Sequence, residues 1–302
     1  MTSQVKHILF ITLSNIGDAI LTTPTLEALH LQYPDAVINI VCDPRSAIIF
    51  KNCPYRGELF LKHKKAGWRG TFILIRQLRQ RHYDIAVDLR SDGLLWLLHT
   101  KQRAFKLANR VSMHLHSAEK HFAAVKKLVT ATSMPAPKVW LSDEERATAS
   151  EMLISYHGLR ILALGLGANF AGKIWPVEQF QALCHALKMQ FDVVLLLGSQ
   201  QDAVLSKAFQ SGCELRVLDC CGKTDLLTTA ALLEQSDYFV GNDSGLGHLA
   251  SAVGTPSFTV FGVGQPHRYR PWGNKALWVQ DAEYNIAKIS GKMVAEKIVN
   301  RS

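Results

Sequence analysis

The sequence predicts an α/β protein of two Rossmann-like domains whose parallel sheets face each other across a central cleft. Three observations support this fold class. The strand-like segments are almost continuous apolar runs, helical segments alternate with them, and the alternation occurs twice, before and after a proline-rich stretch at residues 133–137. Continuous apolar strands are typical of parallel sheets covered by helices on both faces. A chain of 302 residues is long enough for two domains, each with its own core.

The first series begins with a buried strand at residues 8–13, followed by a loop and a helix to about Tyr33 that Pro24 kinks or restarts. A basic segment runs from Lys62 to Arg81, and its later part is helical. The other elements expected in this series are strands at 36–42 and 84–89, helices at 44–51, 94–98 and 117–130, and a basic patch at 101–110.

The second series follows a helix that starts at Ser142 in a capping box with Glu145 and stops at Gly158. Its expected strands are 161–164, 193–197, 215–218, 238–240 and 258–261, and its expected helices are 177–190, 201–210, 226–235 and 285–300. We therefore expect an N-terminal domain at residues 1–150, a C-terminal domain at 151–284, and a final helical segment at 285–302 that packs back on the N-terminal domain.

The excess of positive over negative charge lies entirely in the first half of the chain. Residues 1–150 hold 21 Lys and Arg against 12 Asp and Glu, whereas residues 151–302 hold 13 of each. Such asymmetry favours an acidic partner for the N-terminal half, namely nucleic acid, an anionic membrane surface or a phosphorylated substrate. A surface that merely keeps the protein soluble explains the charge equally well.

Other compositional features exclude several classes of protein. No apolar run approaches the roughly 18 residues of a membrane span, and the apolar segment at residues 8–13 is too short for a signal peptide, so we expect a cytoplasmic protein. Six cysteines form no CxxC pair, which indicates buried free thiols. His114, His116 and His121 have no further ligands at metal-binding spacing, so we expect solvent-exposed histidines there and no metal site.

Residues 238–262 form the stretch that most clearly predicts a ligand site. Gly245 and Gly247 allow close approach of the backbone, and Asp243 or Ser244 is suited to cap the helix that follows. The free N–H groups at a helix N-terminus bind anions. The sequence therefore predicts a phosphorylated ligand at this position.

Three side chains are candidates for chemistry, each with a structural alternative. Asp18 follows the first strand and suits either a general base or a helix N-cap. Lys173 precedes a helix and suits either charge compensation of a diphosphate or an ordinary surface position. His248 is either a hydrogen-bond donor to the ligand or a packed core histidine. Because ligands bind at the carboxyl ends of parallel strands, we expect one rim to hold Asp18, Arg90, residues 165–173, Gly198 and Asp243.

Two nucleotide-binding motifs are incomplete. Gly222-Lys223-Thr224 imitates the end of a P-loop, but Val217 occupies the position of the required earlier glycine. Gly165-Leu166-Gly167 starts like a dinucleotide fingerprint, but Phe170 stands where its third glycine belongs.

Several ordered motifs together give the chain a family resemblance. They are Gly17-Asp18 with Thr23-Pro24, the GKIWP run at 172–176, Gly222-Lys223-Thr224, the GNDSGLGHLA run at 241–250, Gly254-Thr255-Pro256 and Phe261-Gly262. With these motifs the chain resembles the family-nine glycosyltransferases, which include the ADP-heptose:lipopolysaccharide heptosyltransferases. The resemblance implies a GT-B architecture and an inverting, metal-independent transfer that uses ADP-heptose as the donor substrate and no cofactor.

The resemblance also implies roles for individual residues. Asp18 would deprotonate the acceptor hydroxyl, and Lys173 would lie over the donor diphosphate. Ala168 and Asn169 occupy donor-loop positions where heptosyltransferases often carry hydroxyl residues. The remaining donor-binding candidates are Thr224 beside the nucleotide base and Asp243, Ser244, Gly245, Leu246, Gly247 and His248 around the sugar and phosphates.

An anionic lipopolysaccharide core of the lipid A–Kdo type is the acceptor that the resemblance implies, and Arg90, Lys62, Lys64 and Lys65 are candidates for its contacts. Acceptor binding would take place at the inner face of the inner membrane, where basic residues are attracted to the surface. No nucleic-acid partner is expected. Two alternatives remain open: a family member with another nucleotide sugar or acceptor, and a non-enzymatic nucleotide- or nucleic-acid-binding module.

Overall fold

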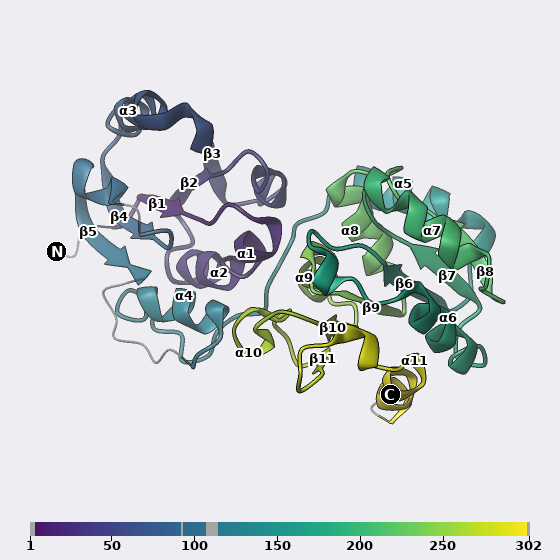
Figure 1. Cartoon of the computed structure of the whole chain (residues 1–302). Helices are drawn as coiled ribbons and strands as arrows, with labels where there is room; N and C mark the ends of the chain where they lie inside the picture. Colours follow the sequence, from purple (N-terminus) through teal and green to yellow (C-terminus); the bar gives the residue numbers. More distant parts are fainter. Residues whose placement is uncertain (1–3, 92, 107–113, 301–302) are drawn as a thin grey trace. The chain divides into compact units, whose positions relative to one another are not determined.

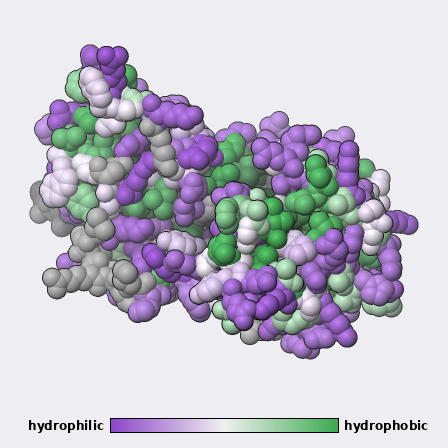
Figure 2. Space-filling model, in the orientation of Figure 1, coloured by the Kyte–Doolittle hydropathy of each residue, from purple (hydrophilic) through white to green (hydrophobic). Residues whose placement is uncertain are grey.

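The computed structural model describes residues 4–91, 93–106 and 114–300 and divides into two compact units, Met1–Trp140 and Leu141–Ser302 (Figure 1). Each unit contains one fully parallel sheet with helices, which confirms the predicted α/β class. Hydrophilic side chains cover much of the face seen in Figure 2, with hydrophobic patches between them. None of the described helices is long and apolar enough to cross a membrane.

The first unit has a five-stranded sheet in the order β3-β2-β1-β4-β5. This order reverses direction between β1 and β4, as in one half of a Rossmann fold. Its strands are β1 (His7–Ile11), β2 (Val37–Cys42), β3 (Arg56–Leu61), β4 (Tyr83–Asp88) and β5 (Thr100–Phe105). Its helices are α1 (Ile16–Ile20), α2 (Thr23–Gln32), α3 (Gly67–Leu78) and α4 (Ser117–Val125), with shorter 3₁₀ turns η1 (Ala47–Phe50), η2 (Lys64–Ala66) and η3 (Leu94–Leu97).

The second unit has a six-stranded sheet in the order β11-β10-β9-β6-β7-β8, with its reversal between β6 and β9. Its strands are β6 (Ile161–Gly165), β7 (Val193–Leu196), β8 (Arg216–Asp219), β9 (Tyr238–Asn242), β10 (Ser257–Phe261) and β11 (Ala276–Gln280). Its helices are α5 (Asp143–Met152), α6 (Val177–Ala186), α7 (Ala203–Gln210), α8 (Leu226–Glu234), α9 (Gly245–Ala252), α10 (Pro266–Tyr269) and α11 (Gly291–Val299). The 3₁₀ turns are η5 (Ile154–Tyr156), η6 (Ala171–Lys173), η7 (Gln200–Asp202) and η8 (Ile286–Lys288).

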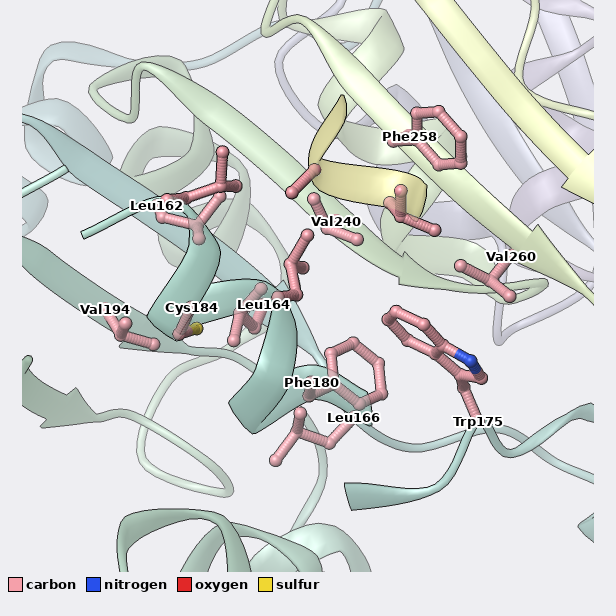
Figure 3. Packing of buried hydrophobic residues seen from close by; sticks show 14 of the residues in the cluster. Leu162, Leu164, Leu166, Trp175, Phe180, Cys184, Val194, Val240, Phe258 and Val260 are labelled. Atoms are coloured by element: carbon pink, nitrogen blue, oxygen red, sulfur yellow. The ribbon is translucent and has the colours of Figure 1, made fainter. Parts of the chain in front are cut away.

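Trp175 lies in the core of the second unit (Figure 3). Its fully buried ring packs edge-on against Phe180, with 4.7 Å between ring centroids. The indole N–H donates to the Ile289 carbonyl oxygen at 2.8 Å, so the polar edge of the ring is satisfied. Trp175 thereby fixes the loop that carries Lys173 to the core, because it follows Lys173 by only two residues.

The sequence analysis missed three strands, β3, β5 and β11, at the outer edges of the two sheets. An outer strand is covered less completely, so its residues need not be continuously apolar. In β5, for example, three of six residues are exposed, and the segment was interpreted as a basic patch. The rest of that predicted patch, residues 107–110, lies outside the described residues.

The domain boundaries also differ from the prediction. The division falls at Trp140, before α5, and not at residue 150, because α5 packs on α8 and Arg146 forms an ion pair with Glu234 at 2.8 Å. The C-terminal helix α11, which was predicted to pack back on the N-terminal domain, packs on α6 within the second unit. Its buried face, which includes Val294 and Ile298, belongs to the core around Trp175.

The predicted exposure of three histidines is correct for His114 alone. His116 is buried at the N-cap of α4, where its ring accepts a hydrogen bond from the Ala118 N–H. His121 is fully buried on α4, with its Nδ1 3.3 Å from the Leu21 carbonyl oxygen. Sequence spacing gave no sign of either role, because both depend on where α4 packs.

Asn242, the last residue of β9, connects two loops of the second unit. Its side chain is fully buried and donates from Nδ2 to the Leu166 carbonyl oxygen at 2.7 Å. Its Oδ1 accepts from the Trp175 N–H at 3.0 Å. The loop after β6 and the loop before α6 are therefore both fixed to the end of β9.

Replacing Asn242 is expected to destabilise the protein strongly. Asn242→Ala removes both hydrogen bonds and leaves the buried Leu166 carbonyl and Trp175 N–H without this partner, so we expect a loss of about 2–4 kcal/mol in the free energy of unfolding. Urea denaturation measures this loss. The exposed Asn274→Ala is the matched control, and equal stabilities of the two variants would contradict the anchoring role of Asn242.

The buried His121 is expected to make stability fall in acid. Burial, and to a smaller extent the nearby Lys106 cation, lowers the pKa of His121 from 6.5 to about 3. Below pH 6.5 the unfolded chain therefore binds a proton that the folded chain does not, and this residue alone should reduce the free energy of unfolding by about 2 kcal/mol between pH 7 and 5. In urea denaturation at both pH values, the free energy of unfolding of His121→Gln should fall correspondingly less between pH 7 and 5. An equal fall in the variant and the wild type would show that His121 does not cause the acid sensitivity.

Candidate functional site

The candidate site of the second unit lies where its sheet order reverses. Gly165 at the end of β6 and Gly241 in β9 are paired in the register of these neighbouring strands. A Cβ atom on Gly241 would lie 2.6 Å from the Phe239 ring and 3.1 Å from the Gly165 carbonyl oxygen. The Phe239 ring and the neighbouring strand end thus occupy the space that a larger side chain at position 241 would need. In doubly wound sheets this reversal point, at the carboxyl ends of the strands, is where ligands bind.

Lys173 and Asp243 meet at this reversal point. Lys173 ends η6, Asp243 follows β9, and the Lys173 Nζ lies 2.6 Å from the Asp243 Oδ2. The two side chains are 25% and 13% exposed, so the ion pair is largely shielded but still accessible to a ligand. A surface lysine, the structural alternative for Lys173, is therefore excluded. The pair gives the site a cation next to a carboxylate.

Gly262 allows the Lys173 loop to reach this position. A Cβ atom on Gly262 would lie 2.2 Å from the Gly172 carbonyl oxygen, a distance that no other residue permits. The Val263 N–H points to the same carbonyl at 3.4 Å, and Gln280 Nε2 donates to the Gly262 carbonyl oxygen at 2.8 Å. The β10–α10 loop and the Lys173 loop therefore pack backbone to backbone.

Helix α9 begins at Gly245, directly after Asp243 and Ser244, as the sequence predicts. Ser244 is in the N-cap position but makes no capping hydrogen bond, and its Oγ is buried without a partner among the described atoms. Asp243 is bound to Lys173 instead. His248 is buried one turn into the helix. The helix N-terminus thus presents first-turn N–H groups and an unpaired hydroxyl, which are donors suited to an anionic or hydroxylated ligand.

The remaining donor candidates follow strands of the same sheet. Ala168, half-buried, and Asn169, exposed, lie in the loop after β6. Thr224 lies after β8, and its hydroxyl is 2.8 Å from that of Thr229 in α8. Leu246 packs beside Gly165: a Cβ atom added to Gly165 would lie 3.1 Å from the Leu246 Cδ1. Gly247 closely approaches Thr259, whose Oγ1 would lie 3.2 Å from an added Cβ.

Asp219, at the end of β8, was not singled out from the sequence. Burial acts to raise its pKa, but hydrogen bonds from the Ser206 hydroxyl and the Cys221 N–H outweigh this and hold the pKa below its usual value. Its backbone carbonyl accepts from Lys223 Nζ at 2.6 Å. Asp219 is therefore an ionised carboxylate that shapes the Thr224 loop.

The cysteines near this loop have no nucleophilic role at neutral pH. All six cysteines of the chain are free, and all except the half-buried Cys213 are buried, as predicted. Burial raises the pKa of Cys221 to about 12 and that of Cys220 to about 11, so both remain protonated thiols. Among the described residues there is also no cluster of three or more His, Cys, Asp and Glu side chains that is placed to hold a metal ion.

In the first unit, Asp18 and Arg90 lie at the reversal point between β1 and β4. Asp18 is in the first turn of α1 and accepts from Asn15 Nδ2 at 2.9 Å, whereas Asn15 occupies the N-cap position. The N-cap alternative for Asp18 is therefore wrong. Arg90 Nη2 donates to the Ser14 Oγ at 2.7 Å and so links the ends of the two strands.

The loop after β4 has a conformation that the sequence did not indicate. The fully buried Asp88 accepts from the N–H groups of Arg90 and Ser91 at 2.9 and 2.7 Å. Ser91 has a φ of +58°, which is unusual for a residue other than glycine. Strained residues of this kind cluster at functional sites, and this one directly follows Arg90, whose backbone N–H is held by Asp88.

The lysines predicted to contact an acceptor lie on a different part of the first unit. Lys62 follows β3, and Lys64 and Lys65 belong to η2, immediately before α3. Lys65 is exposed and Lys62 is half-buried. All three are therefore close in sequence to the N-terminus of α3, at one edge of the five-stranded sheet.

Known proteins resemble this chain in both sequence and fold. Lipopolysaccharide heptosyltransferase 3 of Escherichia coli is 28% identical over 298 residues, which cover 88% of this chain and 86% of that protein. The crystal structure of a family 9 glycosyl transferase from Veillonella parvula has a TM-score of 0.86 at 23% identity and covers 100% and 99% of the two chains. For the E. coli heptosyltransferase WaaC with ADP, the TM-score is 0.78 at 18% identity, with 98% and 100% covered.

These likenesses confirm the GT-B fold class that the motifs implied. A sequence profile described as glycosyltransferase family 9 (heptosyltransferase) matches residues 71–298, which is most of the chain and includes the Lys173, Asp243 and α9 positions. The protein therefore belongs to glycosyltransferase family 9, the heptosyltransferase family.

Proposed function

We propose that this glycosyltransferase transfers a heptose from ADP-heptose to the inner core of lipopolysaccharide, with inversion at the anomeric carbon and without a metal ion. The observation that carries the proposal is the Lys173–Asp243 pair beside the N-terminus of α9, at the reversal point of the second sheet. Family membership supports the reaction class. The lipopolysaccharide heptosyltransferase relative and the ADP-bound structural neighbour support the acceptor and donor.

On the donor side, the second unit supplies groups that compensate negative charge. When the bond between the anomeric carbon and the β-phosphate oxygen breaks, charge develops on the departing ADP. The Lys173 ammonium and the first-turn N–H groups of α9 are fixed before the reaction, and such preorganised donors stabilise developing charge. Ser244, His248 and the carboxylate of Asp243 are polar groups suited to the sugar hydroxyls. Ala168, Asn169 and Thr224 complete the proposed donor contacts.

On the acceptor side, Asp18 of the first unit acts as general base. Its carboxylate accepts the proton of the acceptor hydroxyl while that oxygen attacks the anomeric carbon and ADP leaves with the bonding electrons. The hydrogen bond from Asn15 orients the Asp18 carboxylate. Arg90 and the lysines Lys62, Lys64 and Lys65 are cations suited to the phosphate and carboxylate groups of a lipid A–Kdo acceptor.

Two alternatives are distinguished by ligand preference. A family member that uses another nucleotide sugar would bind UDP or GDP more tightly than ADP in calorimetric titration. A nucleic-acid-binding module, suggested by the charge of the first half alone, would show salt-sensitive DNA or RNA binding and no sugar transfer. Membership of glycosyltransferase family 9 favours the enzyme over such a module.

Asp18→Asn is expected to slow transfer strongly without loss of donor binding. Removing a general base typically lowers the rate by about 10²–10⁴-fold. We expect a decrease of this size in kcat, measured by ADP release with a lipopolysaccharide acceptor, and an unchanged Kd for ADP in calorimetry. Asp35→Asn, at an exposed position of the same unit, is the control. Near wild-type turnover by Asp18→Asn would show that another group is the base.

Changes to the ion pair are expected to shift ADP affinity in opposite directions. Lys173→Met removes a charged hydrogen bond to the diphosphate, so ADP affinity should fall by about 10–100-fold. Asp243→Asn frees the ammonium and removes a negative charge, so ADP should bind more tightly although transfer decreases. Lys207→Met, on the exposed surface of α7, controls for general charge. Equal ADP affinity in all three variants would show that Lys173 does not contact the donor.

A further inference from the structure

Helix α3 of the first unit has an outer face that the proposed reaction does not use. On its inner face, Leu74 and Leu78 are buried in the core of the five-stranded sheet. On its outer face, Trp68, Phe72 and Ile73 are 76%, 63% and 58% exposed. Three large apolar side chains on one exposed helix face are unusual, since such patches generally mark an interaction surface.

The same face is positively charged. Arg69 and Arg76 lie between the apolar side chains at helical spacing, and the Arg69 guanidinium lies over the Trp68 ring at 5.5 Å. The sequence of α3, GWRGTFILIRQL, contains no acidic residue. The nearest carboxylates in the adjoining strands are already paired, Glu58 with Arg81 at 2.8 Å and Asp84 with Lys101 at 2.7 Å. The surface of α3 therefore complements a negatively charged, partly apolar partner.

A second apolar group adjoins the C-terminal end of α3. Arg79, just after the helix, donates from Nε to the Leu97 carbonyl oxygen at 2.8 Å, which ties η3 to α3. In η3, Trp96 and Leu97 are 71% and 47% exposed, and the Trp96 ring stacks on Phe105 with 5.2 Å between centroids. At the end of the first unit that carries α3, hydrophilic and hydrophobic side chains lie side by side (Figure 2).

We propose that the outer face of α3, defined by Trp68, Arg69, Phe72, Ile73 and Arg76, docks the protein on an anionic phospholipid bilayer. A helix of this kind lies in the interface with its apolar side chains among the acyl chains and its basic residues at the headgroups. Tryptophan is enriched at this depth. Each basic residue near an anionic surface strengthens binding by about fivefold. This inference does not depend on the donor or the acceptor, because none of the five residues of this face is among the proposed contacts of either; the proposed acceptor contacts Lys64 and Lys65 lie next to it, directly before α3.

Co-sedimentation of the full-length protein with vesicles tests the proposal. Wild-type protein should bind vesicles of phosphatidylcholine mixed with phosphatidylglycerol at least about tenfold more tightly than vesicles of phosphatidylcholine alone, and salt should weaken the binding. The triple variant W68S/F72S/I73S should bind the anionic vesicles at least about tenfold more weakly. The affinity of the charge variant R69E/R76E for the anionic vesicles should be at least about 25-fold lower than that of the wild type.

A matched control removes three other exposed apolar side chains, Ile154, Met189 and Val204, which are 72%, 88% and 76% exposed in the second unit. I154S/M189S/V204S should bind anionic vesicles like the wild type. Far-UV circular dichroism and urea denaturation, which report on both units, confirm that each variant is folded, and calorimetric titration with ADP measures the donor site of the second unit separately. If ADP binding fails in the wild type while vesicle binding persists, the proposed function is wrong and the docking surface stands.

Three outcomes would overturn the docking proposal. The first is equal vesicle binding by wild type and W68S/F72S/I73S. The second is a concentration-dependent dimer, seen by analytical ultracentrifugation and lost in this variant, without vesicle binding, which would assign the face to a second copy of the chain. The third is binding of single-stranded RNA through the same residues in the absence of vesicle binding.

Discussion

The buried side chain of Asn242 is the constraint on which the second unit's site depends. It accepts from the Trp175 N–H and donates to the Leu166 carbonyl oxygen, so the loops on either side of the reversal point share one partner. Lys173 is two residues from Trp175, and Asp243 is next to Asn242. The ion pair between Lys173 and Asp243 is therefore a consequence of this anchoring. Asn242 and Trp175 thus position the charged groups of the proposed donor site, although neither is among the proposed donor contacts.

The sequence predicted much of this arrangement because its central strands are continuous apolar runs and its loops carry recognisable motifs. The start of α9 and the location of Lys173 before α6 followed from such local signals. The edge strands β3 (RGELFL) and β5 (TKQRAF) were missed because outer strands need less apolar sequence, and the short apolar run of β11 (ALWVQ) was not assigned to any element. The 2.6 Å contact between Lys173 and Asp243 joins residues far apart in the chain, and no local pattern indicates such a contact.

The two units differ in the chemistry that they present. The second unit holds 14 Lys and Arg against 16 Asp and Glu, and its Lys173–Asp243 pair is shielded, which suits a small ligand that must lose its water before reaction. The first unit holds 20 Lys and Arg against 9 Asp and Glu, and part of this excess lies on α3, where apolar and basic side chains alternate on an exposed face. A lipid-anchored acceptor would explain why the proposed catalytic carboxylate and the proposed membrane-docking helix occur in the same unit.

The most direct test of the central claim is transfer itself. The purified protein is incubated with ADP-heptose and lipopolysaccharide from a strain that lacks this protein, and the core oligosaccharide is analysed by mass spectrometry. We expect a mass increase of one heptose residue per core, with stoichiometric release of ADP and no increase when UDP- or GDP-sugars replace the donor. Acceptor that gains no heptose while the protein binds ADP normally, or gains a sugar from another nucleotide, would contradict it.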